Sequence, residues 1–318
     1  MLQGVKQSIR AIIPFLLRTR AAEEDPGEQQ RRFFAQKTAT LRCGNFDLLS
    51  PESHLLFELQ KIGPYRDLCI GISAKIICDK YHDASIVDIG ANIGDTAAII
   101  ASHVSNKLIL VEGSDYYYKF LEKNLHLFPN AIVPIKAMVS DGKVIQGELR
   151  HWGGTAYFKG IEQEELTTPT LPLSEIADEN TRFIKIDTDG FECSILNAAL
   201  PWLEQQRPAI LFENQLRNDI DLKQFSNLYD SLSTIGYRYF VAWDDPGFHI
   251  LSTDSVDAVK DLNRYQYNIH KSNLPRINNY DIICLHESDE DIYAELTRFW
   301  RTDHALPRQN VQPLMRAA

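Results

Sequence analysis

Short apolar runs alternate with segments of helical periodicity through most of the 318-residue chain. The run Ser85–Ile89 contains a single acidic residue and is typical of a buried strand. Two glycines follow it, and residues 95–100 have the pattern of a helix that begins at Asp95. Six more apolar runs predict strands, at residues 107–111, 131–139, 182–186, 209–212, 237–243 and 281–285. Further helices are expected at 114–127, with Ser114 as the N-cap, and at 288–301.

Seven strands with helices between the early ones predict an α/β fold, a doubly wound, Rossmann-like seven-stranded sheet. Residues 144–173 have turns and aromatic residues without a helical period, and they predict a β-type insertion or flap. We expect a mainly helical N-terminal extension at 1–80, the main domain at 81–290, and a C-terminal helix and tail at 291–318.

The first 20 residues alternate apolar and basic positions at helical spacing, which predicts an amphipathic helix. Such a helix could touch a membrane surface or a partner subunit, but packing on its own domain or on a second copy is favoured. A homo-oligomer formed through the N-terminal extension is therefore one possibility that the sequence leaves open.

Composition limits the classes of function. Hydrophobic residues make up 44% and charged residues 24%, as in a globular protein with a sizeable core. The net charge of −10, without a dense run of basic residues, disfavours a nucleic-acid partner. The five widely spaced cysteines lack a C-x-x-C motif, which disfavours a disulfide framework or zinc site and favours a reducing, cytoplasmic location. No apolar run approaches the roughly 18 residues of a membrane span, and no signal peptide is expected.

The stretch S-I-V-D-I-G-A-N-I-G-D-T at 85–96 is the strongest candidate for ligand binding. A strand, a glycine turn and a helix N-terminus bring backbone N–H groups toward a ligand. The spacing D-x-G-x-x-x-G differs from the dinucleotide pattern G-x-G-x-x-G, and its acid suits a cationic group or a hydroxyl. An ordinary strand-to-helix turn is the alternative. The candidate binding residues are Asp88, Gly90, Ala91, Asn92, Gly94, Asp95 and Thr96.

Polar residues follow the carboxyl ends of several predicted strands, where α/β sheets bind ligands. Glu112 ends the second strand and can accept hydrogen bonds from both hydroxyls of a ribose, with Gly113 and Ser114 beside it. Asp141, after Ser140, either accepts from an adenine amino group or is simply a turn residue.

The second dense motif is F-I-K-I-D-T-D-G-F-E at 183–192. Lys185 and Asp187 share one face of the predicted strand, because side chains alternate along it. They form either a structural ion pair or part of the reaction centre. Asp189 follows where the next helix begins, and Glu213 ends the following strand.

These motifs together resemble the FkbM-type family of S-adenosylmethionine-dependent methyltransferases. The resemblance covers roughly 85–240. This chain has Glu112-Gly113 where the family more often has Glu-Pro, and Asp189-Gly190 where Glu-Gly is more frequent. Both changes keep the acid. The segments that carry the resemblance are V-D-I-G-A-N-I-G-D-T (87–96), V-E-G-S (111–114), T-L-P-L-S-E-I (170–176), F-I-K-I-D-T-D-G-F-E (183–192) and R-P-A-I-L-F-E (207–213).

The resemblance implies a class I methyltransferase sheet, S-adenosylmethionine as cofactor, and O-methylation of a sugar or natural-product-like small molecule. The cofactor-binding residues would be those named above from Asp88 to Asp141. As general base we rank Asp187 first, before Asp189 and Glu213, with Lys185 beside it.

Other interpretations of the same residues stay open. His151 and His249 are alternative bases, and paired acids could instead hold Mg²⁺, although no metal ligands are assigned. The competing functions are a non-catalytic cofactor-binding module that acts through protein contacts and a nicotinamide-dependent oxidoreductase. Methylation of protein or nucleic acid is less favoured.

Overall fold

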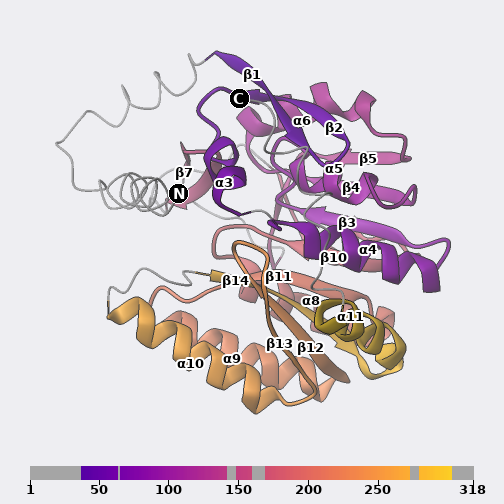
Figure 1. Ribbon diagram of the computed structural model, residues 1–318, viewed down its shortest axis with the longest axis vertical. Helices are drawn as coiled ribbons and strands as arrows, with labels where there is room; N and C mark the ends of the chain where they lie inside the picture. The colour runs from indigo at the N-terminus through magenta and orange to yellow at the C-terminus, as the bar shows by residue number, and fades with distance from the viewer. Residues whose placement is uncertain (1–36, 64, 142–147, 160–168, 273–278, 303–318) are drawn as a thin grey trace. The chain divides into compact units, whose positions relative to one another are not determined.

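The computed structural model describes residues 37–63, 65–141, 148–159, 169–272 and 279–302 (Figure 1). The amphipathic helix expected at 1–20 and the expected tail beyond 302 lie outside these ranges. Contacts divide the chain between Gln36 and Lys37. Within the part described, no helix is both long and apolar enough to cross a membrane.

An eight-stranded sheet forms the centre, in the order β13-β12-β14-β11-β10-β3-β4-β5. The strands from β5 to β11 are parallel, whereas β14 runs antiparallel to both of its neighbours. The predicted doubly wound sheet is confirmed, and β13 is an added edge strand that the sequence analysis missed. The bounds are β3 Ser85–Ile89, β4 Lys107–Val111, β5 Ile132–Ile135, β10 Thr181–Ile186, β11 Ala209–Gln215, β12 Tyr237–Asp244, β13 His249–Thr253 and β14 Asn279–His286.

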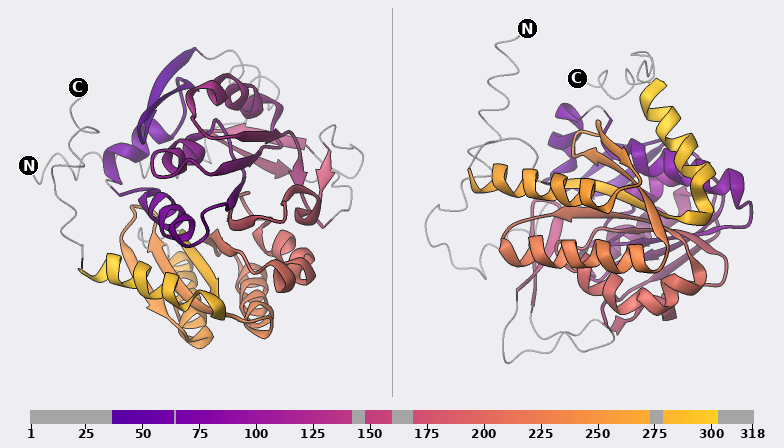
Figure 2. Two further views of the ribbon diagram at one scale, coloured as in Figure 1. Left: turned by 90° about the vertical axis from the view of Figure 1, so that its right-hand side faces the viewer. Right: turned by 90° about the horizontal axis from the view of Figure 1, so that it is seen from below.

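Helices cover both faces of this sheet (Figure 2). On one face α11 packs against α4, which packs against α5; on the other, α9 packs against α8 and α10. Strand β3 is therefore buried over its whole length, as its continuous apolar run predicts. The helices are α3 Leu56–Ile62, α4 Leu68–Lys80, α5 Asp95–Ala101, α6 Asp115–Asn124, α7 Leu173–Ile176, α8 Glu192–Gln206, α9 Asp219–Thr234, α10 Val256–Lys271 and α11 Glu290–Thr302, with 3₁₀ turns at Leu125–Leu127 and Glu287–Asp289.

Smaller β elements surround the central sheet. Strands β1 (Thr38–Cys43) and β2 (Phe46–Pro51) form one antiparallel hairpin, and β7 (Glu148–Trp152) and β8 (Thr155–Lys159) form another. The second hairpin confirms the β-type insertion for the described residues.

The third predicted strand, 131–139, is wrong as a single element. It divides into β5 and β6 (Met138–Val139), and β6 pairs with β9 (Thr170–Leu171) instead of the central sheet. Apolar residues of both pieces are alike in pattern, so periodicity could not show that the chain leaves the sheet between them.

Candidate active site

The glycine turn after β3 is fixed by close backbone contacts. Gly90 has a φ of +82°, and a Cβ atom there would lie 1.9 Å from the carbonyl oxygen of Asp187. The N–H groups of Gly90 and Ala91 both donate to the carbonyl oxygen of Val111 at 2.9 Å. Only glycine fits this position, because any side chain would collide with the end of β10. The turn is thereby held against the ends of both neighbouring strands.

Glu112 is buried just beyond the end of β4 and is oriented by the backbone. Its Oε2 accepts a hydrogen bond from the N–H of Asn92 at 2.8 Å, and its Oε1 accepts one from the N–H of Ser114 at 2.6 Å. Burial raises the pKa of Glu112 to about 7. Ser114 also caps α6 as predicted, accepting from the N–H groups of Tyr116 and Tyr117. One carboxylate therefore joins the glycine turn to the start of α6.

Lys185 bridges two carboxylates inside the sheet. Its Nζ lies 3.3 Å from Oδ1 of Asp88 and 3.5 Å from Oδ2 of Asp187. Burial by itself lowers the pKa of Lys185, but the two aspartates outweigh it and keep the pKa above its ordinary value. The structural ion pair considered in the sequence analysis is present, and it includes Asp88 as well as Asp187.

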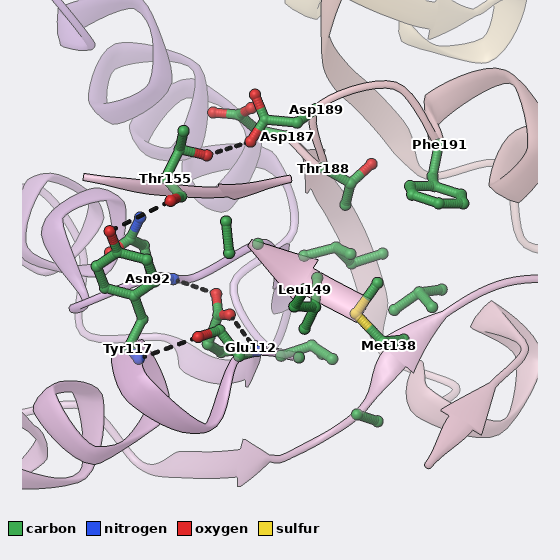
Figure 3. A pocket seen from close by; sticks show the side chains of 18 residues that line it. Asn92, Glu112, Tyr117, Met138, Leu149, Thr155, Asp187, Thr188, Asp189 and Phe191 are labelled. Atoms are coloured by element: carbon green, nitrogen blue, oxygen red, sulfur yellow. Dashed lines mark hydrogen bonds between the residues drawn. The ribbon is translucent and has the colours of Figure 1, made fainter. Parts of the chain in front are cut away.

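A first pocket of about 560 Å³, including its open mouth, lies beside the carboxyl ends of β3, β4 and β10 (Figure 3). Its polar lining comes from the glycine turn, Glu112 and the segment after β10, and its apolar lining from β6, the β7–β8 hairpin and the start of α8. The size is typical of a small-molecule site. The polar side chains are Asn92, Glu112, Ser114, Tyr117, Thr155, Asp187, Thr188 and Asp189, and the apolar ones include Met138, Leu149 and Phe191.

A second pocket of about 720 Å³, again with its mouth, adjoins the first. Its lining combines leucines of the segment that contains α3 with charged residues on and after strands of the sheet. Both pockets share five residues, so they form two compartments of one site. The shared residues are Gly90, Asn92, Thr155, Asp187 and Asp189; the second compartment adds His54, Leu55, Leu56, Leu59, Arg66, Asp95, Thr96, Gly153, Gly154, Lys185 and Glu213.

The β7–β8 hairpin is fastened where the two compartments meet. Nδ2 of Asn92 donates to the carbonyl oxygen of Gly154 at 2.7 Å. The N–H of Leu55 donates to the carbonyl oxygen of Gly153, also at 2.7 Å. The hydroxyl of Thr155 donates to Oδ2 of Asp189 (Figure 3). Contacts from three separate segments therefore fix the tip of this hairpin.

Arg66 and Glu213, which line the second compartment, have polar partners outside its lining. Arg66 forms an ion pair with Asp245, and its Nε lies 3.9 Å from Oδ2 of Asp67. Glu213 lies within β11 rather than at its end, and it accepts a hydrogen bond from Asn279. Burial, helped by the nearby carboxylates, raises the pKa of Glu213 well above its ordinary value.

Most of the predicted residues lie in the two compartments, but five do not line either one. Asp88, Ala91 and Gly94 lie outside the lining, and the side chain of Asp88 is fully buried against Lys185. Ser140 and Asp141 also lie outside the lining. The preceding residues Met138 and Val139 line the first compartment instead. The other predicted residues line one or both compartments.

The two histidines considered as bases line neither compartment. Nε2 of His151 lies 2.6 Å from the hydroxyl of Ser114, and burial lowers the pKa of His151 to about 4. Nε2 of His249 lies 2.8 Å from the hydroxyl of Ser252. Among the described residues, no group of three or more His, Cys, Asp or Glu side chains is arranged to hold a metal ion.

Several lining residues were missed by the sequence analysis. Phe191 and Tyr117 stand next to predicted site residues, so the motifs themselves could have pointed to them. His54 and Arg66 lie before the recognised motifs and carry no local pattern. Only the packing of their segment against the turn brings them to the site.

Comparison with known proteins gives a match to one family. Residues 88–239, just under half of the chain, match the family described as methyltransferase FkbM domain. No curated protein matches the sequence.

Solved structures with a similar arrangement include the methyltransferase FkbM from Methylobacillus flagellatus KT, at 16% identity and a TM-score of 0.39 over 63% of this chain and 44% of that one. This chain therefore spans less than half of that protein's length. Another is an O-methyltransferase from Bacillus cereus in complex with SAH, at 11% identity and a TM-score of 0.39 over 86% of this chain and 97% of that one. A third is the plantazolicin methyltransferase BamL in complex with a triazolic desmethylPZN analog and SAH, at 9% identity and a TM-score of 0.41 over 73% of this chain and 89% of that one.

The family match covers the glycine turn, Glu112, and the segment from β10 to β11, which are the parts that build the first compartment. Residues 88–239 are therefore similar to the methyltransferase domain of the FkbM family.

Proposed function

We propose that the protein transfers the methyl group of S-adenosylmethionine to a hydroxyl of a small molecule such as a sugar or a natural product. The observation that carries this proposal is the pair of adjoining compartments. One has the lining that a nucleoside needs, the other is open to an acceptor, and two aspartates line both. The methyl donor supplies an electrophilic carbon, and the chain supplies binding, alignment and proton removal.

The first compartment suits the adenosyl part of the donor. Glu112 would accept hydrogen bonds from the ribose hydroxyls, as an acid at the end of the second strand does in related sheets. Met138, Leu149 and Phe191 offer an apolar surface for the adenine ring. Asp88 would act indirectly, by holding Lys185 and through it Asp187.

The second compartment suits an acceptor with both apolar and hydroxyl-bearing faces. Leu55, Leu56 and Leu59 supply apolar lining, and carboxylates supply polar lining. Aligning an acceptor oxygen with the methyl carbon can supply ~7–11 kcal/mol of the barrier. A positioned general base typically contributes ~10²–10⁴-fold more.

Calorimetric titration with S-adenosylhomocysteine, with NADH in parallel, tests the cofactor. We expect micromolar binding of the first compound only, and its loss in Glu112→Gln. Glu122→Gln is the matched control, because Glu122 is exposed on α6 away from the lining. Binding of NADH alone would contradict the proposal.

Transfer of a labelled methyl group to a panel of sugars, phenols and aliphatic alcohols then tests the reaction. Labelled methyl ethers are the expected products. Donor binding without transfer to any hydroxyl compound would favour a non-catalytic binding module instead.

A further inference from the structure

Asp187 and Asp189 are the two carboxylates, among the described residues, that line both compartments. They are held differently. Asp187 faces the ammonium group of Lys185 at 3.5 Å. Asp189 accepts the hydroxyl of Thr155, which comes from the tip of the β7–β8 hairpin.

The backbone conformation of Asp189 is also unusual. Its φ of +55° is in the left-handed region, which is costly for a residue with a side chain. Nη1 of Arg217 donates to its carbonyl oxygen at 3.3 Å, and Gly190 follows with a φ of +121°. Strain of this kind persists where the surroundings hold it, and here it directs a carboxylate to the junction of the compartments.

We propose that Asp189 is the carboxylate at the reacting centre and that Thr155 is the residue that positions it. This inference rests on the proposed methyl transfer and deepens it. It also revises the order of candidate bases, in which the sequence alone placed Asp187 first. Thr155 bonds to Oδ2 of Asp189, which leaves Oδ1 to serve the acceptor.

The step is balanced in atoms and charge. Asp189 takes the proton of the acceptor hydroxyl while that oxygen forms a bond to the methyl carbon. The carbon–sulfur bond breaks, and its electron pair stays on sulfur, so the cationic donor becomes neutral S-adenosylhomocysteine. The products are a methyl ether and a protonated Asp189, which returns its proton to water.

The surroundings give Asp189 a proton affinity suited to this task. Burial raises the pKa of Asp189 to about 6, and Asp187 on β10's end and Glu192 on α8 add to the rise. The hydrogen bond from Thr155 and the charge of Arg217 act in the opposite direction. A base works best when its pKa lies near the working pH.

Three further groups in the two compartments also have shifted pKa values. Buried Glu213 on β11 has its pKa raised well above its ordinary value, partly by Asp189. Tyr117 on α6 likewise has a raised pKa, chiefly through burial. Lys185 stays charged, because its carboxylate partners raise its pKa.

The test needs no acceptor, because the methyl donor and its product differ in charge at the sulfur. An ionised carboxylate beside the sulfur favours the cationic donor, whereas a protonated one does not. We would measure the Kd of S-adenosylmethionine and of S-adenosylhomocysteine by calorimetry from pH 5 to pH 8. Groups that meet only the shared adenosyl part, such as Glu112, cancel in the ratio of the two constants.

We expect preference for the donor to rise with pH by about tenfold, the change that corresponds to a coupling of about one pKa unit. The midpoint should lie near pH 6, where Asp189 loses its proton.

Thr155→Val removes the hydrogen bond that stabilises the carboxylate, so the midpoint of this variant should move to higher pH. Thr155→Ser keeps a hydroxyl and should restore the wild-type midpoint. Asp189→Asn should abolish the rise of donor preference with pH. This variant tests the inference even if Thr155→Val does not fold.

Each outcome decides a separate point. If neither compound binds, the proposed function fails and this inference fails with it. If both bind with a ratio that does not change with pH, or if Thr155→Val leaves the midpoint unchanged, only the inference is wrong. If Asp187→Asn abolishes the rise and Asp189→Asn preserves it, Asp187 is the reacting carboxylate.

Discussion

Nζ of Lys185 lies 3.3 Å from Oδ1 of Asp88, and the two side chains are 5% and 0% exposed. They are register partners on the neighbouring parallel strands β10 and β3. The charge of Asp88 is balanced mainly by Lys185, whereas Lys185 also lies 3.5 Å from Oδ2 of Asp187. This pair lies directly beneath the strand ends that carry the site.

Removing the lysine should therefore cost much stability. Lys185→Met leaves Asp88 as an uncompensated buried charge, and we expect unfolding in urea to require about 3–5 kcal/mol less free energy. Lys75→Met is the matched control, because the Lys75–Asp79 pair on α4 is about half exposed. Its effect should stay below about 1 kcal/mol. Equal losses in both variants would show that burial does not strengthen the inner pair.

The first glycine of the turn should tolerate no side chain. In Gly90→Ala the new Cβ would overlap the carbonyl oxygen of Asp187, so the turn must move and binding of S-adenosylhomocysteine should fall at least about tenfold. Gly153→Ala is the control: its φ is also positive, but no atom lies within 4 Å of the added Cβ. It should cost only about 1–2 kcal/mol of stability. Similar binding by the two variants would contradict the steric argument.

Binding of S-adenosylhomocysteine should depend on pH through Glu112. Its pKa lies at about 7 rather than its ordinary 4.5, chiefly because of burial. The carboxylate that we propose to accept ribose hydroxyls forms only above that pH, so affinity should rise from pH 6 to pH 8. Calorimetry should show this rise in the wild type and not in Glu112→Gln. A rise that survives in the variant would assign the effect to another group.

The same shift has a consequence for the ligand-free fold. Between pH 4.5 and about 7 the native state keeps a proton on Glu112 that the unfolded chain has lost. Stability should therefore decrease as the pH rises through this interval, and Glu112→Gln should weaken that decrease. Urea titrations at pH 5 and pH 8 provide the measurement.

Asn92 should hold the β7–β8 hairpin over the site. Its side chain donates to Gly154 and lies 3.4 Å from Nε2 of His54, so Asn92→Ala should release the hairpin tip. Amide hydrogen exchange at residues 153–156 should then become faster, and S-adenosylhomocysteine should bind more weakly. Asn106→Ala also removes side-chain bonds to backbone carbonyls, at His82 and Ala84, but away from both compartments. Equal exchange in the hairpin of both variants would contradict this role.

The sequence was most informative where the evidence is local. The strands Ser85–Ile89 and Lys107–Val111 were predicted with their observed bounds, because a continuous apolar run is typical of a strand covered on both faces. Ser114 was identified as an N-cap from its position alone. The placement of Glu112, Asp187 and Asp189 at one edge follows from the parallel order of the strands, which brings their carboxyl ends together.

The sequence was least informative where the evidence is a contact between distant residues. The edge strand β13 is short and only half-buried, so its pattern is weak. Residues 131–139 have one apolar pattern but two partners, β4 and β9. Asp141 has the residue type for an adenine contact but lies outside the lining.

By itself, then, the sequence determined the α/β class, most strands of the central sheet and the acids at their carboxyl ends, because hydrophobic periodicity and strand handedness act over short stretches of chain. Tertiary structure decided that Lys185 faces Asp88, that Thr155 reaches Asp189, and that Arg66 joins the second compartment. These are pairings of side chains from separate elements. Their partners are set by the register of strands and the path of loops, which only packing of the whole sheet fixes.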